Sequence, residues 1–463
     1  MAAPKVIATM PARQFTPPTI APPAQPMSIA RAMLVMGDNP LKIWDQALFH
    51  MPHRAIPWQK KTFYQVMDPA LIQAIYVDHA DIFPKSPMQL RVTRPGIGEG
   101  LLTVQGPAWR RQRRAASPVF RAEALKELVP IFNAAGETAA ISLAQAGPHS
   151  PIDVMPAMTR ATLEVIAHAV LAADNPSLDL EQTAKSVTQY VETIGRVDVG
   201  DVFGVPHWAR PDKFAGSRAI QSMRATADAA IAWRRSNPSR GGDLLYQLMH
   251  ATDPETGEHL TEIELRDNVL TFIAAGHETT SLALTWALYL IANAPDIQDR
   301  LYTEVHTAYG TEPLCSEALT NLPFHEAVVK EAMRLFPPVS VLQRIAAQDL
   351  SIGTIAVRKG DLLASLIYVM QRSHLLYDAP AMFVPDRFLD HRADTRHRFA
   401  WMPFGAGPRI CIGLRLAMME SVAILATLVR RLEFSPNPNY IPMPLMRLTL
   451  RPHAGMPLHV RPR

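Results

Sequence analysis

One short stretch decides how the rest of the chain is interpreted: Phe404-Gly405-Ala406-Gly407-Pro408-Arg409-Ile410-Cys411-Ile412-Gly413. It places a cysteine at the end of a loop rich in glycine and proline, where an apolar helix is expected to begin at Leu414. A helix N-terminus favours negative charge, and the thiolate is the form of cysteine that binds metals. Arg409 adds a cation suited to carboxylates. Alone, Cys411 would be taken as an inert thiol, but the whole stretch indicates a cradle for an iron porphyrin with a cysteine ligand.

Composition sets the broad limits. The 463 residues are 48% hydrophobic, which is ample for a large core, and 46 basic against 42 acidic residues give a net charge of +4. This weak basicity, without a recognition-helix motif, argues against a nucleic-acid binder. The two cysteines, Cys315 and Cys411, exclude a disulfide framework and favour a reducing, cytoplasmic compartment.

The beginning of the chain is rich in proline and has no long apolar run. We expect residues 1–27 to form a flexible leader, neither a signal peptide nor a membrane anchor. Residues 271–294 are long enough to span a bilayer, but the polar run 277–280 interrupts them. A buried core helix is the better interpretation, so no integral membrane segment is expected.

The remaining residues, 28–463, show no internal repeat and no linker, and we expect one mainly α-helical domain with a minor β-sheet region. Strand-like residues occupy 58–66 and 350–366, with turns at Gly353 and Gly360. Caps or prolines predict helix starts at Asp68-Pro69, at Ala108, at Thr261 with Glu264 in the capping-box position, and at Pro323. The segment 378–403 is predicted to be irregular.

A polar run interrupts the apolar helix predicted to end near Asn293: Ala275-Gly276-His277-Glu278-Thr279-Thr280. Gly276 would clear room for a small ligand, Thr279 could hydrogen-bond it, and Glu278 could relay protons from solvent. The alternative is a threonine that bonds its own helix and a glutamate that reaches the surface. From the residues alone, the two interpretations are equally supported.

A third group is Glu331 and Arg334, three residues apart on one predicted helix face and therefore within salt-bridge reach. Most such pairs lie on solvated surfaces. Between this pair and Cys411 lies Pro385-Asp386-Arg387-Phe388, which adds a second arginine.

Together these motifs resemble the cytochrome P450 family. The cysteine stretch matches its haem-binding loop Phe-x-x-Gly-x-Arg-x-Cys-x-Gly at every fixed position, and residues 275–280 resemble its oxygen-binding motif. Glu331 with Arg334 resembles the family's Glu-x-x-Arg helix, and 385–388 its Pro-x-Arg-Phe loop. The resemblance covers about residues 52–463 and implies the single-domain P450 fold, an orthogonal helical bundle around haem b.

The resemblance also implies a role for each matching residue. Cys411 would be the axial iron ligand, Glu278 and Thr279 the catalytic acid–alcohol pair that delivers protons, and His277 would have no role. Glu331, Arg334 and Arg387 would form a buried structural network. The expected haem contacts are Trp109, Arg113 and Arg344, with Arg409 also directed at a propionate, and Phe404, Gly413, Ala275 and Gly276. Arg110, Arg111, Arg114 and Arg415 could form a basic face for an acidic redox partner.

The implied activity is that of a monooxygenase, which inserts one atom of O2 into a hydrophobic small molecule by hydroxylation or epoxidation. Because the sequence has no dinucleotide fingerprint and too few cysteines for an iron–sulfur cluster, electrons must come from a ferredoxin or flavodoxin with an NAD(P)H reductase. The alternatives are a peroxide-driven enzyme on the same fold and a non-catalytic haem-binding protein. We expect a monomer. The substrate is left open, with specificity expected in residues 85–101, 197–211 and 339–342.

Overall fold

The computed structural model describes residues 15–463 apart from 59, 146–149, 194–199, 201–213, 239–242, 311, 316–318 and 390–394. The predicted specificity segment 197–211 therefore lies outside the described residues, apart from Gly200. The α-helices are α1 (Ile29–Met36), α2 (Pro69–Gln73), α3 (Pro87–Ile97), α4 (Gly106–Ala116), α5 (Ala122–Lys126), α6 (Val129–Ala144), α7 (Met155–Val170), α8 (Leu180–Thr193), α10 (Phe214–Ser236), α11 (Leu244–His250), α12 (Glu262–Ala292), α13 (Pro295–Tyr309), α15 (Pro323–Leu335), α16 (Ile367–Met370) and α18 (Leu414–Arg431). The strands are β1 (His53–Trp58), β2 (Lys61–Val66), β3 (Ile152–Asp153), β4 (Val341–Ile345), β5 (Leu350–Ile352), β6 (Ile355–Val357), β7 (Leu362–Leu366), β8 (Leu432–Pro436), β9 (Pro444–Met446), β10 (Leu450–Pro452) and β11 (Pro457–Pro462).

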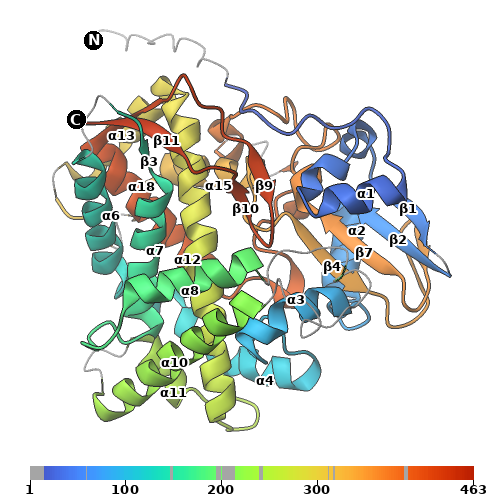
Figure 1. Ribbon diagram of the computed structural model, residues 1–463, viewed down its shortest axis with the longest axis horizontal. Helices are drawn as coiled ribbons and strands as arrows, with labels where there is room; N and C mark the ends of the chain where they lie inside the picture. Colours follow the sequence, from blue (N-terminus) through green and yellow to red (C-terminus); the bar gives the residue numbers. More distant parts are fainter. Residues whose placement is uncertain are drawn as a thin grey trace, which may run out of the picture.

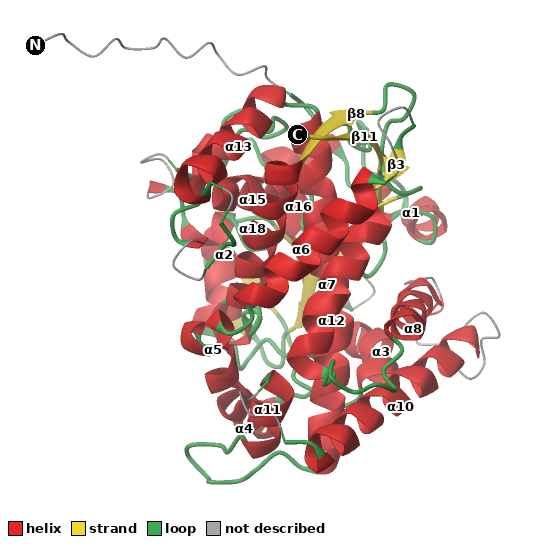
Figure 2. Ribbon diagram, turned by 90° about the vertical axis from the view of Figure 1, so that its left-hand side faces the viewer, coloured by secondary structure: helices red, strands yellow, loops and turns green. Residues whose placement is uncertain are grey.

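The long helix α12 runs through the middle of the molecule (Figure 1). It begins at the predicted capping box, in which the Thr261 side chain accepts from the Glu264 N–H and the Glu264 carboxylate accepts from the Thr261 N–H. Its apolar residues face neighbours on all sides, because α7, α10, α15 and α18 all pack against it. Figure 2 shows α6, α7 and α12 lying side by side as the bulk of the helical part. The long segment is therefore a buried core helix, as predicted, and no helix among the described residues has the length and apolar character needed to cross a bilayer.

The sheets are small, and the one that contains β1, β2, β4 and β7 lies to one side of the helices (Figure 1). The largest has the order β1-β2-β7-β4, in which β2 pairs with β7 in parallel and the other pairs are antiparallel. Strand-like residues were predicted over 58–66, and the structure has strands there that begin earlier, at His53. The chain forms two strands, β1 and β2, which pair from His53 with Val66 to Trp58 with Lys61. Residues 59 and 60, which separate the two strands, are neither glycine nor proline, so the sequence contains no turn signal between them.

The other predicted elements occur where expected. Asp68 caps α2, α15 spans the predicted 323–335, and 350–366 forms β5, β6 and β7 with turns at Gly353 and Gly360. The irregular segment contains two short 3-10 helices, η7 (Pro385–Phe388) and η8 (Arg398–Ala400). The fold is mainly α-helical with minor sheets, as predicted from the sequence.

The predicted flexible leader, 1–27, is described only from residue 15 onward. Phe15 packs edge-on against Tyr289, with ring centroids 5.9 Å apart, and its carbonyl accepts a hydrogen bond from the Phe383 N–H at 2.9 Å. The Pro23 carbonyl accepts from the Gln46 N–H at 3.0 Å. This part of the predicted leader therefore lies on the domain.

Candidate active site

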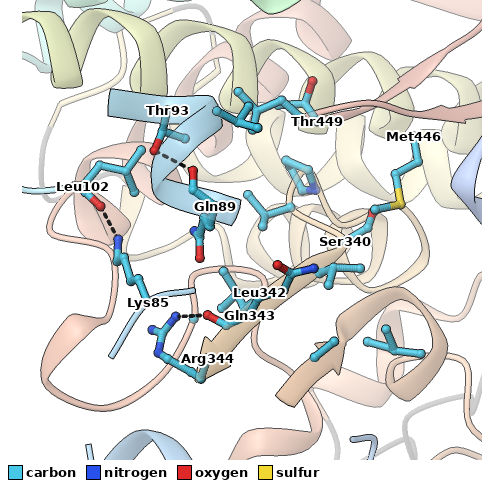
Figure 3. Close-up of a pocket in the computed structure, with 18 of the residues that line it drawn as sticks. Lys85, Gln89, Thr93, Leu102, Ser340, Leu342, Gln343, Arg344, Met446 and Thr449 are labelled. Atoms are coloured by element: carbon cyan, nitrogen blue, oxygen red, sulfur yellow. Dashed lines mark hydrogen bonds between the residues drawn. The ribbon is translucent and has the colours of Figure 1, made fainter. Parts of the chain in front are cut away.

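A cavity of about 970 Å³ lies between α12, α3, α4, β4 and the cysteine loop. Figure 3 shows part of its wall, with Gln89 and Thr93 on α3 facing Leu342 and Gln343 on β4, and with Thr449 and Met446 beside them. The predicted catalytic and haem-contacting residues all line this one cavity, namely Trp109, Arg113, Ala275, Gly276, Glu278, Thr279, Arg344, Phe404, Arg409, Cys411 and Gly413. In the sequence, these residues are spread from Trp109 to Gly413.

Cys411 is set by a loop that glycine makes possible. The loop contains the 3-10 helix η9 (Gly407–Arg409), and the Cys411 N–H donates to the Phe404 carbonyl at 2.9 Å. Gly407 has φ +68°, and a Cβ there would lie 1.8 Å from the Tyr76 carbonyl oxygen, so only glycine fits. Cys411 faces the cavity, and α18 begins three residues after it.

The electrostatics around the thiol are mixed. Cys411 is accessible from the open cavity, and the protein that surrounds the cavity raises the pKa of its thiol by desolvation, while the Gly413 N–H and the nearby Arg113 lower it. No group of three or more His, Cys, Asp or Glu side chains that could hold a metal occurs in the part of the chain that the structure describes. A metal at Cys411 therefore needs a cofactor that brings most of its own ligands, as a porphyrin does.

Lys85, Arg113, Arg344 and Arg409 form one group among the cationic residues that line the cavity. Arg344 and Lys85 are 6% and 9% exposed and lie on paired backbone segments at one end of it (Figure 3). The Arg409 guanidinium lies 4.1 Å from the centre of the Trp109 ring and donates to the Val104 carbonyl at 2.8 Å. Arg113 completes the group.

These cations depress one another's pKa. Burial lowers the pKa of Arg409 to about 10, assisted by Arg344 and Arg113, and burial lowers the pKa of Arg113 as well. The pKa of Lys85 falls well below its ordinary value, because the ammonium is buried and lies near Arg344 and Arg409.

Within the described residues, none of these four side chains forms an ion pair with a carboxylate. Two buried cations, Lys85 and Arg344, and two half-buried ones, Arg113 and Arg409, are costly to hold together unless an anion joins them. The cluster fits a cofactor that carries two carboxylates, as haem does. From the sequence, Lys85 was predicted only to belong to the specificity segment 85–101. A single lysine after a proline carries no signal that it joins a cluster of cations.

Glu278 forms contacts that were not predicted from the sequence, whereas Thr279 forms the bond to its own helix that was considered as an alternative. The Glu278 carboxylate accepts from the Thr449 hydroxyl at 2.9 Å and pairs with Arg451, so it is 9% exposed and does not reach the surface. The Thr279 hydroxyl donates to the Ala275 carbonyl at 2.7 Å, which is the bond to its own helix considered above. Its oxygen keeps lone pairs that can accept a hydrogen bond from the cavity.

The role expected of Gly276 needs a correction. A Cβ at this position would lie 2.5 Å from Cδ1 of Ile166 on α7. The glycine therefore makes room for a packed side chain of the neighbouring helix, and not only for a ligand. The sequence could not indicate this, because Ile166 is 110 residues away.

The predicted structural network is fully assembled. Arg334 bonds Glu331 through two contacts, Nε–Oε2 at 2.6 Å and Nη2–Oε1 at 2.8 Å, and Arg387 Nε lies 3.0 Å from Glu331 Oε1. The side chains of Glu331 and Arg334 are 0% exposed. The Val384 N–H also donates to Glu331 at 2.9 Å.

Glu420, an acidic residue of the cavity wall, is not among the predicted site residues. Glu420 on α18 lines the cavity, is 1% exposed, and its Oε1 has no hydrogen-bond partner among the described residues. Burial raises the pKa of Glu420 well above its ordinary value, because no cation in the described part of the chain offsets the loss of water around the carboxyl group. The one signal in the sequence for a buried acid was that Glu420 is the single acidic residue of the otherwise mainly apolar helix α18.

The predicted basic face was wrong for three of its four arginines, because carboxylates neutralise them. Arg110 pairs with Asp81, Arg111 with Glu258 and Glu264, and Arg114 with Asp253 and Glu255. These pairs tie α4 to neighbouring segments. Arg415 remains exposed.

Comparison with known proteins places these features in a family. The profile of the family described as Cytochrome P450 matches residues 22–457. A bifunctional cytochrome P450/NADPH–P450 reductase of Fusarium oxysporum is 29% identical over 377 residues, which cover 78% of this chain and 35% of that protein. The chain thus spans about a third of the length of this fused relative. The cytokinin hydroxylase of Arabidopsis thaliana is 30% identical over 406 residues, which cover 85% of this chain and 77% of that protein.

A solved structure agrees. The crystal structure of the haem domain of cytochrome P450DA superposes with a TM-score of 0.81 at 28% identity, covering 96% of this chain and 98% of the other. The chain belongs to the cytochrome P450 family.

Proposed function

We propose that this chain is a haem-thiolate monooxygenase. In the overall reaction, a C–H bond, O2, two electrons and two protons give a hydroxylated product and one water, and an alkene gives an epoxide with the same balance. The carrying observation is that Cys411, a cluster of buried and half-buried cations, and the Glu278–Thr279 pair line one mainly apolar cavity. A ligand-binding protein would need the first two of these but not the third.

The residues support a specific placement of the cofactor. Arg113, Arg344 and Arg409 would hold the two propionates of haem b, with Trp109 against Arg409, and Cys411 would ligate the iron. When bound, a haem with a thiolate ligand supplies oxygen activation, with cleavage of the O–O bond favoured by the electron-rich sulfur. Phe404, Gly413, Ala275 and Gly276 would contact the ring.

The proton-handling residues are Glu278 and Thr279. Glu278 would accept protons from the solvent side, and Thr279, whose hydroxyl is fixed on the Ala275 carbonyl, would orient them within the cavity. The network of Glu331, Arg334 and Arg387 would hold the segment before the cysteine loop, and takes no part in chemistry.

The partners follow from the site. The cavity wall is mainly apolar, which supports a hydrophobic substrate. Two cysteines cannot build an iron–sulfur cluster, so we propose a ferredoxin or flavodoxin with an NAD(P)H reductase as the electron source. We further propose that residues 28–463 act as one catalytic unit, as a monomer and in the cytoplasm.

One experiment separates the candidate activities. The haem-loaded protein is screened for spectral shifts with steroids, fatty acids, terpenes and aromatics, and the responding compound is then incubated with reductase, ferredoxin and NADPH, with hydrogen peroxide alone, or with neither. We expect oxygenated product in the first arm. Product with peroxide only would identify a peroxide-driven enzyme, and spectral binding without product in either arm would identify a haem-binding protein.

A further inference from the structure

A second cavity, of about 290 Å³, shares no lining residue with the cavity at Cys411. Three segments enclose it: the chain around Ile20, the 3-10 helix η2 (Gln46–His50), and residues 368–381. Arg372 lines this second cavity and is 5% exposed. None of the described residues that line it is acidic. The wall therefore holds a buried cation and no carboxylate to balance it.

The guanidinium of Arg372 has free hydrogen-bond donors. Within the described part of the chain, its Nε, Nη1 and Nη2 atoms have no hydrogen-bond partner. Its Cζ atom lies 3.9 Å from the ring centre of Tyr368 and 5.1 Å from that of Phe336. Contacts with aromatic rings engage the faces of a guanidinium, whereas its N–H groups point outward in its plane. That edge is the part to which a carboxylate binds with two parallel hydrogen bonds.

The buried ion network next to Arg372 does not supply the missing anion. Glu331 is already shared between Arg334 and Arg387, so two cations face one carboxylate there. Burial lowers the pKa of Arg372 to about 10, and Arg334 adds to this effect, while Tyr368 and Glu331 oppose it. The guanidinium is still charged near neutral pH. Water could satisfy its N–H donors but would leave its charge without a partner.

The rest of the wall indicates which kind of anion fits. Ile20, Pro22 and Phe49 give the cavity a hydrocarbon surface, and its volume exceeds what a single inorganic oxyanion fills. The rings of His50 and His374 also line the cavity and stack with their centres 4.3 Å apart. Both histidines are exposed, so they lie where the cavity meets solvent. A ligand that suits this wall has a negative end and an apolar body.

We propose that this second cavity binds a small organic carboxylate, whose charged group pairs with the free edge of Arg372 and whose hydrocarbon part lies against Ile20, Pro22 and Phe49. The binding site is separate from the cavity at Cys411 and does not depend on the proposed function. A guanidinium with a carboxylate and an apolar body beside it is held by charge, hydrogen bonds and burial together.

The ligand would act on a part of the fold that leads to the cysteine loop. Gln371, the residue before Arg372, donates from its side chain to the Arg334 carbonyl at 3.0 Å and accepts from the Met402 N–H at 2.9 Å. Arg372 itself contacts Phe336, which follows α15. Neutralising the guanidinium therefore stabilises the junction between α15 and the segment before Cys411, so binding should be measurable as protein stability.

The test uses the haem-loaded full chain at constant ionic strength in Tris-chloride buffer. Sodium benzoate is the probe, benzamide is its uncharged analogue, and inorganic phosphate is an anion without a hydrocarbon part. Titration calorimetry measures binding, and circular dichroism measures the melting temperature. Arg372→Met removes the charge but keeps a long side chain against Tyr368. Arg300→Met is the matched control, because Arg300 also lies over a ring, 3.6 Å from the centre of Phe324, but forms an exposed ion pair with Asp386.

We expect benzoate to bind the wild type at one site and to raise its melting temperature by about 1–2 °C at about ten times the dissociation constant. Benzamide and phosphate should have little effect. Arg372→Met should weaken benzoate binding by about tenfold or more, whereas Arg300→Met should leave it unchanged.

The proposal is overturned if benzoate does not bind, if its binding survives in Arg372→Met, or if benzamide or phosphate acts as strongly. Survival in Arg372→Met would place benzoate elsewhere, for example in the cavity at Cys411. If Arg372→Met fails to fold, crystals of the wild type with 4-bromobenzoate decide the question. Anomalous scattering from bromine in the second cavity would support the proposal, and a bromine signal only at other positions would refute it.

Discussion

Arg334 clamps Glu331 in a two-point ion pair that no solvent reaches, with Nε–Oε2 and Nη2–Oε1 distances of 2.6 and 2.8 Å. The remaining guanidinium donors reach the carbonyls of Gln371, Pro380 and Met382, at 2.7 to 2.9 Å. One side chain of α15 thereby fixes three points of an irregular segment. That segment leads to the cysteine loop. The ion pair therefore helps to set the position of Cys411, which lies 80 positions after Glu331 in the chain.

Replacing Glu331 with alanine should leave the Arg334 charge buried and unpaired, at a cost of about 3–5 kcal/mol in the free energy of unfolding. We expect little or no haem-loaded protein, measured as the ratio of haem to protein after purification, and the same for Arg334→Ala. Glu326→Ala on the same helix removes only an exposed pair with Lys330 and should cost about 0.5 kcal/mol or less. Normal haem incorporation in Glu331→Ala would refute the structural role of the network.

Replacing Cys411 with serine or histidine should remove the thiolate from the iron. The reduced CO complex should then lose the red-shifted Soret band that a thiolate-ligated haem of this family gives. Cys315→Ser is the matched control, because Cys315 is exposed and does not line the cavity. A loss of the band in Cys315→Ser with retention in Cys411→Ser would reverse the assignment.

Lys85 should make the haem-free protein sensitive to pH. Its pKa in the folded chain lies well below the value of about 10.4 in the unfolded chain. Between these two values the unfolded chain binds the proton and the folded chain does not, so stability rises with pH across this window. Urea unfolding of haem-free protein at several pH values measures the effect.

Lys85→Met should flatten this pH dependence and stabilise the haem-free protein. If Lys85 also attracts a propionate, the haem-loaded variant should lose its haem faster to a scavenging acceptor protein. Lys185→Met is the control, since Lys185 forms an exposed pair with Glu181. An unchanged pH dependence in Lys85→Met would show that the ammonium finds solvent or a counter-charge in the folded protein.

The sequence predicted best where a feature depends on residues close together in the chain. The capping box at Thr261 and Glu264, the Glu331–Arg334 pair and the cysteine loop are all of this kind, because each spans ten residues or fewer. The contacts of Glu278 with Arg451, and of Gly276 with Ile166, join residues more than 100 positions apart, and a single sequence holds no record of such pairs. The ion pairs of Arg111 with Glu264 and of Arg114 with Asp253 were not predicted for the same reason. The pair of Arg110 with Asp81 joins residues 29 positions apart, which also lie in different segments.

Gly407→Ala should displace the cysteine loop. Its φ of +68° disfavours any side chain by about 1–2 kcal/mol, and the added Cβ would lie 1.8 Å from the Tyr76 carbonyl oxygen, which is backbone and cannot rotate away. Gly405→Ala is the matched control in the same loop, because its φ of +76° carries the same strain while its Cβ would meet Leu342 at an ordinary 3.5 Å. We expect Gly405→Ala to lower the melting temperature but keep a thiolate-type CO spectrum, and Gly407→Ala to lose both haem and spectrum. Equal behaviour of the two variants would mean that the loop tolerates the clash with Tyr76, and that backbone strain alone governs how it holds Cys411.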